Sequence, residues 1–305
     1  MARVAPIARL DRAGPVVADR SLVGHALQRM LRNQLAVVGL VIVVALVLVA
    51  VLADVVAPHD PNAQDCATGA LRGPSAGHLL GTDGTCRDVL SRLIHGSRVS
   101  LSVGILSQVA ILFIALPIGT LAAMGGRLVD NLLMRFTDLV YAFPELLAII
   151  LLRQVLEDAP VPGGSLFVII AAISLVGWVT VARLVRGQML SLKEREYVTA
   201  ARAAGAGGTR VALVHILPNG LGPIIVVLTF GVPMAIFAEA ALSFIGIGIA
   251  PPTATWGGMV DSGYRAVFGT PMLVVYPAVA IAITMMAFTF IGDGLRDALD
   301  PRSAR

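Results

Sequence analysis

The sequence predicts an all-α integral membrane protein with six transmembrane helices, from its composition and from six long apolar runs. Hydrophobic residues make up 57% of the 305 residues and charged residues 14%, and the mean hydropathy is +0.85. Soluble domains carry about 25% charged residues. The composition therefore indicates a chain that folds in lipid.

The first span is the most apolar of the six runs. From Asn33 to Ala53 the chain has 21 residues without a charge, enough at about 1.5 Å per residue to cross a hydrocarbon core of about 30 Å. A cleaved signal peptide is the alternative, but its apolar core would be shorter, about 7–15 residues. We expect five further spans, near residues 99–126, 132–156, 165–187, 221–249 and 271–292.

The basic residues predict the orientation of these spans. An even number of spans places both termini on the same side of the membrane. With the amino terminus in the cytoplasm, 17 of the 23 Lys and Arg fall on the inner side and six on the outer side. This bias matches the positive-inside rule and predicts cytoplasmic amino and carboxyl termini. The arginines lie on the flanks of the spans without interleaved aromatic residues, so nucleic-acid binding is not indicated.

Five segments follow from this topology: a cytoplasmic leader over 1–34, the first transmembrane helix over 35–57, an extracytoplasmic loop over 58–98, a five-helix core over 99–292 and a cytoplasmic tail over 293–305. Late in the loop, one helical face collects Val89, Leu90, Leu93 and Ile94. Such a face predicts a separate helix that lies along the membrane surface before the second span begins.

The only two cysteines, Cys66 and Cys86, fall in the extracytoplasmic loop. An extracytoplasmic environment permits a disulfide, which would restrain this Gly- and Pro-rich segment. Unpaired thiols, or a metal site that includes His59 or His78, are the alternatives. No tight ligand spacing is present, so we expect no metal site.

A charged, alanine-rich segment, Glu194 to Asn219, interrupts the apolar runs after the fourth span. Its acidic start, its helix formers Ala200 to Ala204 and its stop at Gly205 predict a short helix parallel to the membrane. One face of this helix carries Tyr197, Ala200, Ala201 and Ala204. These residues are small enough for a groove of another protein to close over the helix. A re-entrant or merely amphipathic loop is the alternative.

The rest of the segment predicts a turn and a second helix. Gly207 and Gly208 permit the turn, Thr209 can cap the second helix, and Pro218 redirects the chain into the fifth span.

This segment resembles the EAA motif of permease subunits of bacterial ABC importers, written E-A-A, three residues, Gly, nine residues, I-x-L-P. The matching residues here are Thr199-Ala200-Ala201, Gly205 and His215-Ile216-Leu217-Pro218. Thr199 stands in place of the motif glutamate and His215 in place of its isoleucine. A salt bridge made by that glutamate therefore does not carry over to this chain.

The resemblance extends from Leu79 to Arg302, and over this longer range it indicates one particular group of permeases. Five ordered blocks are similar to the C-type permease of dipeptide and oligopeptide importers: LLGTDGTCRDVLSRLIHGSRVSLSVG, REYVTAARAAGA, HILPN, AEAALSFIGIGIAPPTATWGGMV and GDGLRDALDPR. Cys86 stands where that family usually has glycine, which strengthens the expectation that it pairs with Cys66.

The resemblance implies a type I ABC importer permease fold in the bacterial cytoplasmic membrane. It also implies a homologous sister permease, two cytosolic ABC ATPases and an extracytoplasmic peptide-binding protein as partners. Segment 190–220 would seat in an ATPase groove as a coupling helix. The residues that would make this contact are Glu196, Tyr197, Ala200, Ala201, Ala204, Gly205, Leu217 and Pro218.

Catalysis and cofactor binding are not expected of this chain. It has no G-x-x-x-x-G-K-[ST] sequence, and its single lysine, Lys193, follows no glycine-rich loop. It also lacks H-E-x-x-H and a nucleophile elbow. ATP and Mg²⁺ would therefore bind to the partner subunits.

Three carboxylates fall within the predicted spans, where ionisable groups mark pathways or buried pairs. Asp138 is expected to pair with Arg135, one turn earlier, whereas Glu145 and Glu239 are candidates for a translocation path. A nickel importer of the same permease group, a proton-driven secondary carrier and a channel are the alternative functions. A secondary carrier needs no ATPase-docking segment and commonly shows internal repeats, which this sequence lacks.

Overall fold

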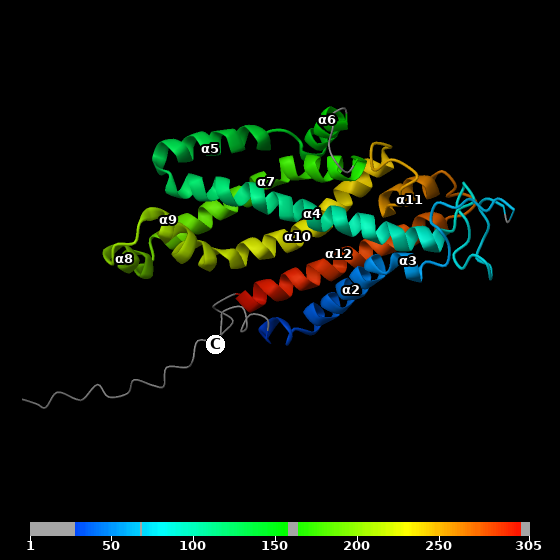
Figure 1. The fold of residues 1–305 in the computed structure, drawn as a ribbon, viewed down its shortest axis with the longest axis horizontal. Helices are drawn as coiled ribbons and strands as arrows, with labels where there is room; N and C mark the ends of the chain where they lie inside the picture. Colours follow the sequence, from blue (N-terminus) through cyan, green and yellow to red (C-terminus); the bar gives the residue numbers. More distant parts are fainter. Residues whose placement is uncertain (1–27, 68, 158–163, 300–305) are drawn as a thin grey trace, which may run out of the picture.

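The computed structural model describes residues 28–67, 69–157 and 164–299, and the regular elements in this part of the chain are helices. Figure 1 shows the long helices running side by side, with α8 and α9 at one end and the loop between α3 and α4 at the other. The elements are α2 (Gln34–Val51), α3 (Ala53–Val56), α4 (Val89–Met124), α5 (Gly126–Tyr141), α6 (Glu145–Glu157), α7 (Gly164–Lys193), α8 (Glu196–Ala203), α9 (Gly208–Arg210), η1 (Val211–Ile216), α10 (Leu217–Phe244), α11 (Trp256–Tyr264) and α12 (Met272–Leu299).

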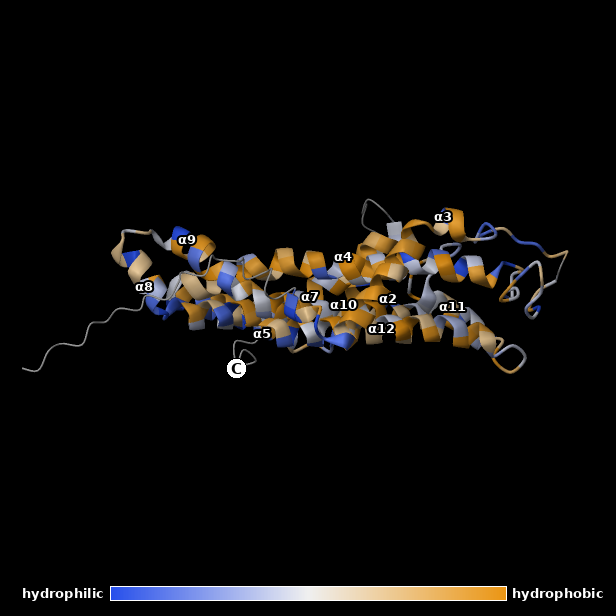
Figure 2. Cartoon of the chain, turned by 90° about the horizontal axis from the view of Figure 1, so that it is seen from below, coloured by the Kyte–Doolittle hydropathy of each residue, from blue (hydrophilic) through white to orange (hydrophobic). Residues whose placement is uncertain are grey.

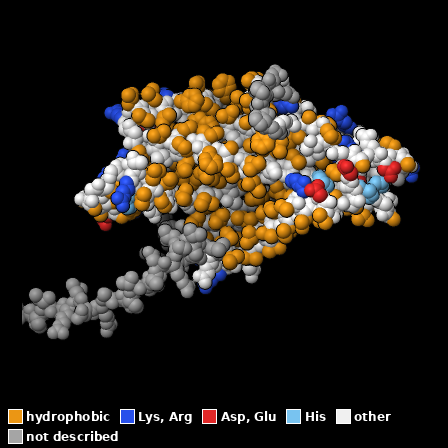
Figure 3. Space-filling model, viewed as in Figure 1, with side chains coloured by type: hydrophobic (Ala, Val, Ile, Leu, Met, Phe, Trp, Pro, Cys, Tyr) orange, Lys and Arg blue, Asp and Glu red, His pale blue; other side chains and the backbone are white. Residues whose placement is uncertain are grey.

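Five of the described helices are long and apolar enough to cross a membrane, and a bent pair makes a sixth span if it counts as one. The five are α2, α4, α7, the run from α9 through α10, and α12. Hydrophobic residues predominate along the middle of the helices (Figure 2), and on the face shown in Figure 3 most charged side chains lie toward the two ends. The all-α membrane fold is therefore confirmed.

The predicted third span, residues 132–156, is not one straight helix. It consists of α5 and α6, which meet at an angle of 92° around Pro144. Proline lacks the amide proton that a continuous helix needs and disfavours helical geometry at the residue before it, so the break at this position has a local cause.

α5 is amphipathic in a way that explains its position beside α7. Its exposed apolar residues recur at helical spacing and are Leu128, Leu132, Phe136 and Leu139. Its acidic residues Asp130 and Asp138 instead bond to Arg186 and Arg183 of α7. The charged face of α5 thus turns inward, and its apolar face turns outward.

The predicted surface helix before the second span is wrong as a separate element. Val89 begins α4, which continues without interruption for 36 residues to Met124. Asp88 caps it, because the Asp88 carboxylate accepts a hydrogen bond from the Ser91 N–H at 2.7 Å. At about 1.5 Å per residue such a helix is about 54 Å long, so it extends beyond a hydrocarbon core of about 30 Å.

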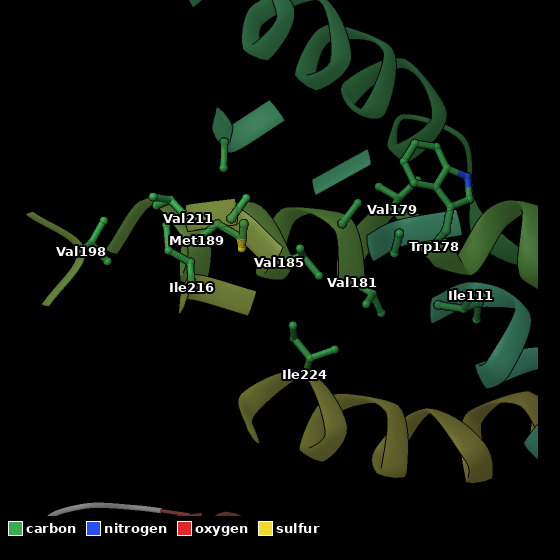
Figure 4. Close-up of a cluster of buried hydrophobic side chains, with 14 residues drawn as sticks. Ile111, Trp178, Val179, Val181, Val185, Met189, Val198, Val211, Ile216 and Ile224 are labelled. Atoms are coloured by element: carbon green, nitrogen blue, oxygen red, sulfur yellow. The ribbon is translucent and has the colours of Figure 1, made fainter. Parts of the chain in front are cut away.

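The central core lies where α4, α7 and α10 meet, and it continues to α8 and η1. Figure 4 shows this cluster as a row of small and β-branched side chains that runs from Trp178 to Val198. Gly119 lets α4 and α7 approach closely, because a Cβ atom there would lie 2.6 Å from the carbonyl oxygen of Ala182. α7 therefore connects the membrane core directly to α8, which follows the carboxyl end of α7.

Candidate functional site

The helix predicted between Glu194 and Ala204 is present as α8, Glu196–Ala203. It ends where expected: Gly205 has a φ of +88°, a backbone geometry that glycine adopts freely. The Gly205 N–H donates to the carbonyl of Arg202 at 2.9 Å, and the Ala206 N–H donates to the carbonyl of Ala201 at 3.0 Å. The backbone after Gly205 therefore folds back on the helix instead of extending it.

One side of α8 is anchored, and the other is open. Val198 is fully buried and joins the same cluster as Val211 and Ile216 (Figure 4). The opposite side carries Tyr197, which is 40% exposed, and the exposed Ala200 and Ala204. The structure thus presents a small-residue face to the outside on a helix that cannot rotate without losing its buried valine.

The second helix of this segment starts earlier than the sequence indicates. Its N-cap is Gly207, which makes no side-chain capping bond, and α9 begins at Gly208. The prediction that Thr209 caps this helix is therefore wrong, since Thr209 already lies inside its first turn. Glycine tolerates the cap position through its backbone alone.

The chain then passes through a π-helical turn, η1, directly into α10. Pro218 lies in the first turn of α10, where a missing amide proton costs little. The prediction that Pro218 redirects the chain is therefore wrong, since Gly208–Phe244 is one continuous helical run in which only the helix type changes, at Leu217. π-Helical turns occur frequently at functional sites, and here the turn places the buried Val211 and Ile216 against α8.

α7 is tied to the membrane core just before α8. The Lys193 ammonium, at the last residue of α7, donates to the carbonyl of Ala123 near the end of α4 at 3.2 Å. A lysine at a helix carboxyl end also interacts favourably with the helix dipole. Displacement of α8 would therefore be transmitted to both α7 and α4.

A groove of about 460 Å³ opens between α4, α6, α7 and α10, and Glu145 lines it. Glu145 is the first residue of α6 and is exposed. Gln108 also lines the groove, and its amide donates to the carbonyl of Gly231 at 3.1 Å. Apart from these polar groups the walls are mostly apolar, including Ile149 and Phe230.

Glu239 lies elsewhere. Its side chain is fully buried, and its carboxylate accepts a hydrogen bond from the Ser243 hydroxyl at 2.7 Å. It is not among the residues that line the Glu145 groove. The two glutamates that the sequence singled out together are therefore not brought together, and a path role for either one stays a prediction.

The expected pair of Asp138 with Arg135 is wrong. Asp138 instead accepts a hydrogen bond from Arg183 of α7 at 2.8 Å, and Arg183 also lies 4.5 Å from the ring centre of Tyr141. Sequence reasoning also missed the bond from Arg186 to Asp130, at 2.6 Å for one of its two contacts. Both pairs join residues more than 40 positions apart, so no local spacing could indicate them.

At the opposite end of the molecule, the disulfide between Cys66 and Cys86 is confirmed, with the two Cα atoms 5.1 Å apart. Asp83 organises the loop around it by accepting hydrogen bonds from Thr85 and Arg87. Burial raises the pKa of the Asp83 carboxyl, but these bonds outweigh it and hold that pKa below its usual value. The Asp83 carboxylate is therefore charged at neutral pH.

Comparison with known proteins identifies the family. Residues 115–305 match the family described as binding-protein-dependent transport system inner membrane component, and residues 21–74 match the N-terminal transmembrane domain of oligopeptide transport permease C.

Relatives cover nearly the whole chain. The oligopeptide transport system permease protein OppC of Bacillus subtilis is 42% identical over 92% of this chain and 90% of its own. The dipeptide transport system permease protein DppC of the same organism is 41% identical over 92% of this chain and 86% of its own. OppC of Escherichia coli K12 is 35% identical over 94% and 93%.

Among solved structures, the inward-facing MetNI methionine ABC transporter has a chain with the same fold. The TM-score is 0.56 at 19% identity, over 68% of this chain and 96% of the other. With a family match that covers more than half of the sequence and relatives this similar over most of their length, the chain belongs to the binding-protein-dependent transport system inner membrane components.

Proposed function

We propose that this chain is a permease subunit of an ABC importer that moves dipeptides or oligopeptides across the cytoplasmic membrane by alternating access. The names of its relatives support peptides as the cargo, and the shared fold supports an importer. The observation that carries the proposal is the exposed small-residue face of α8, at one end of the bundle and anchored to its core.

The partners would be a sister permease, two cytosolic ATPases that bind ATP and Mg²⁺, and an extracytoplasmic binding protein. The coupling residues would be Glu196, Tyr197, Ala200, Ala201, Ala204 and Gly205, with Leu217 and Pro218 at the start of α10. The chain itself would bind no nucleotide.

The coupling would work through rigid contacts. Closure of the ATPases would push α8, and the buried Val198 would pass this displacement to η1 and α10. The Lys193 bond to Ala123 would pass it to α4. The groove lined by Glu145 would then form one wall of the path, and the sister permease would supply the other.

Replacing Ala201 with Trp tests the docking role. We expect loss of ATPase binding and at least about a tenfold reduction in transport-coupled ATP hydrolysis, because a bulky ring would keep a groove from closing over α8. The Gly205→Val variant should act similarly, since a β-branched residue is strained at a φ of +88°. The measurements are ATPase co-purification and peptide-stimulated ATP hydrolysis in the reconstituted complex.

The control is Ala203→Trp, which adds the same ring to α8 outside the Tyr197 face, at an exposed position, whereas Ala201 is half-buried. We expect it to retain most of the coupling. Equal coupling in all three variants would refute the docking role, provided that thermal unfolding shows an intact membrane bundle. If the ATPases bound to the parent complex but peptides did not stimulate ATP hydrolysis, peptides would be excluded as the cargo.

A further inference from the structure

Three groups with metal-binding chemistry meet at the outer end of α4. The ligand atoms of His59, His78 and Asp88 all lie within 4.8 Å of one another. The two imidazole rings lie side by side, with centres 4.8 Å apart. Within the described residues this is the only group of three or more His, Cys, Asp or Glu side chains gathered in this way.

Both rings direct the same nitrogen toward one carboxylate. The Nδ1 atom of His78 lies 2.9 Å from Oδ1 of Asp88, and the Nδ1 atom of His59 lies 3.8 Å from Oδ2. The second distance is too long for a hydrogen bond. Two donors that each lie about 2.0–2.2 Å from one ion in tetrahedral geometry are separated by roughly 3.3–3.6 Å. The distance from His59 to Asp88 is therefore closer to the separation of two ligands of one ion than to the length of a hydrogen bond.

The two histidines are held in place by backbone hydrogen bonds that leave their imidazole nitrogens free of these contacts. His78 sits in a tight turn: its N–H donates to the Ser75 hydroxyl at 3.1 Å, and its carbonyl accepts from the Ser75 N–H at 2.8 Å. The His59 N–H donates to the hydroxyl of Ser91 at 3.0 Å. The Ser91 N–H in turn donates to Oδ2 of Asp88. Such outer contacts orient the ligands of metal sites.

The accessibility of the group also fits a cation. The Asp88 side chain is 1% exposed and that of His78 is 8%, whereas the His59 side chain is 41% exposed. His59 therefore lies at an entrance through which an ion can reach the buried pair.

Neighbouring groups leave the cluster available. The two cysteines are bonded to each other and offer no thiolate. Arg92 lies one turn after Asp88, but its side chain is directed to the carbonyl of Pro61 and to Asp83. His95, the other histidine at this end, contacts Asp54 instead, at 3.2 Å.

We propose that His59, His78 and Asp88 bind a divalent transition-metal ion of the zinc class on the extracytoplasmic face. Two imidazoles and one carboxylate are ligands that Zn²⁺ accepts, and three protein ligands leave a fourth position for water. The ion would take the place of the hydrogen bond between Nδ1 of His78 and Asp88, and the His78 ring would carry its N–H on Nε2 instead. The ion would tie His59, in the chain after α3, to the start of α4, in addition to the link that the Cys66–Cys86 disulfide makes between the same loop and the residues just before α4.

Zinc binding by the full-length chain in nanodiscs, carrying an affinity tag without histidine, tests this site. We expect one Zn²⁺ per chain by competition with a chromophoric chelator. X-ray absorption should show two imidazole nitrogens at about 2.0–2.1 Å. His59→Gln should lower the affinity at least about tenfold, since even outer-shell changes cost 10–100-fold. His78→Gln should lower it as much.

Two other histidines provide matched controls. His95→Gln removes a histidine at the same end but outside the cluster, and His215→Gln removes one at the opposite end. Both variants should bind Zn²⁺ like the parent protein. The proposal fails if the parent binds Zn²⁺ no more tightly than His59→Gln, whose exposed position keeps the fold intact, or if His95→Gln weakens binding as much as His59→Gln does.

Discussion

Cys86 shows how a single residue can be held in an unfavourable backbone geometry by its side-chain bond. Its φ is +62°, in the left-handed region that L-residues other than glycine avoid. The resemblance to the C-type permeases places a glycine at this position, which would adopt that φ freely. A cysteine therefore occupies a glycine position here, and the disulfide to Cys66 joins the loop at this point.

Replacing Cys86 separates these two effects. Cys86→Gly and Cys86→Ser both remove the disulfide, but only glycine relieves a left-handed geometry that costs roughly 1–2 kcal/mol. We expect the loop to open about fivefold less often in the glycine variant, a difference of about 1 kcal/mol. Native-state proteolysis of the loop measures this equilibrium.

The control is Cys66→Ser, which breaks the same bond and leaves Cys86 in place. It should behave like Cys86→Ser. Equal cleavage rates for Cys86→Gly and Cys86→Ser would mean that the backbone at this position relaxes once the disulfide is gone.

At the scale of elements, the packing of α4 against α7 determines whether movement of α8 can reach the membrane core. Gly119 makes this packing close, because Ala182 and Val185 of α7 lie where its side chain would be. Gly187, on α7, has no atom within 4 Å of the place where its Cβ would stand, apart from its chain neighbours and the nearby backbone of its own helix. These two glycines therefore have different physical roles.

Larger side chains at these two positions should have opposite effects. Gly119→Val forces carbon atoms against a backbone carbonyl, so we expect destabilisation by about 1–3 kcal/mol or more. Gly187→Ala fills open space and improves helix propensity, so the stability should stay the same or rise by about 0.5–1 kcal/mol. Thermal unfolding of both variants in the same nanodiscs measures the difference. Equal midpoints would show that α4 and α7 separate at no cost.

At the scale of the whole molecule, the disulfide loop and α8 lie at opposite ends (Figure 1). Exposed apolar side chains cover the length between them, among them Phe113 at 74% and Val155 at 70%. The α8 end carries Lys193, Arg195, Arg202 and Arg210, which belong to the 17 Lys and Arg on the side predicted to be cytoplasmic, so this end is predicted to face the cytoplasm.

Single introduced cysteines test this orientation, because the native cysteines are bonded to each other. In spheroplasts, a membrane-impermeant maleimide should label Ala76→Cys, which is exposed in the outer loop. Ala204→Cys, which is exposed beside α8, should react only after the membrane is opened. The reverse pattern would invert the proposed topology and exclude docking of a cytosolic ATPase on α8.

The sequence by itself determined the features that depend on local physics. Hydropathy sets which segments lie in lipid, and it indicated all five continuous spans. The end of α8 follows from Gly205, since the left-handed φ there is a property of glycine. Pro144 is a local signal for the break in the third span. Hydropathy alone missed this break, because it shows which segments are apolar but not the direction in which each helix runs.

Only the tertiary structure decided which distant residues meet. Asp138 pairs with Arg183 because α5 lies against α7, and it does so instead of pairing with Arg135 on its own helix. Glu239 is buried because other helices cover it. His59 and His78 are 19 positions apart, and they meet because a loop returns the chain to the start of α4. Such contacts depend on how the helices and loops pack, which residue spacing along the chain does not encode.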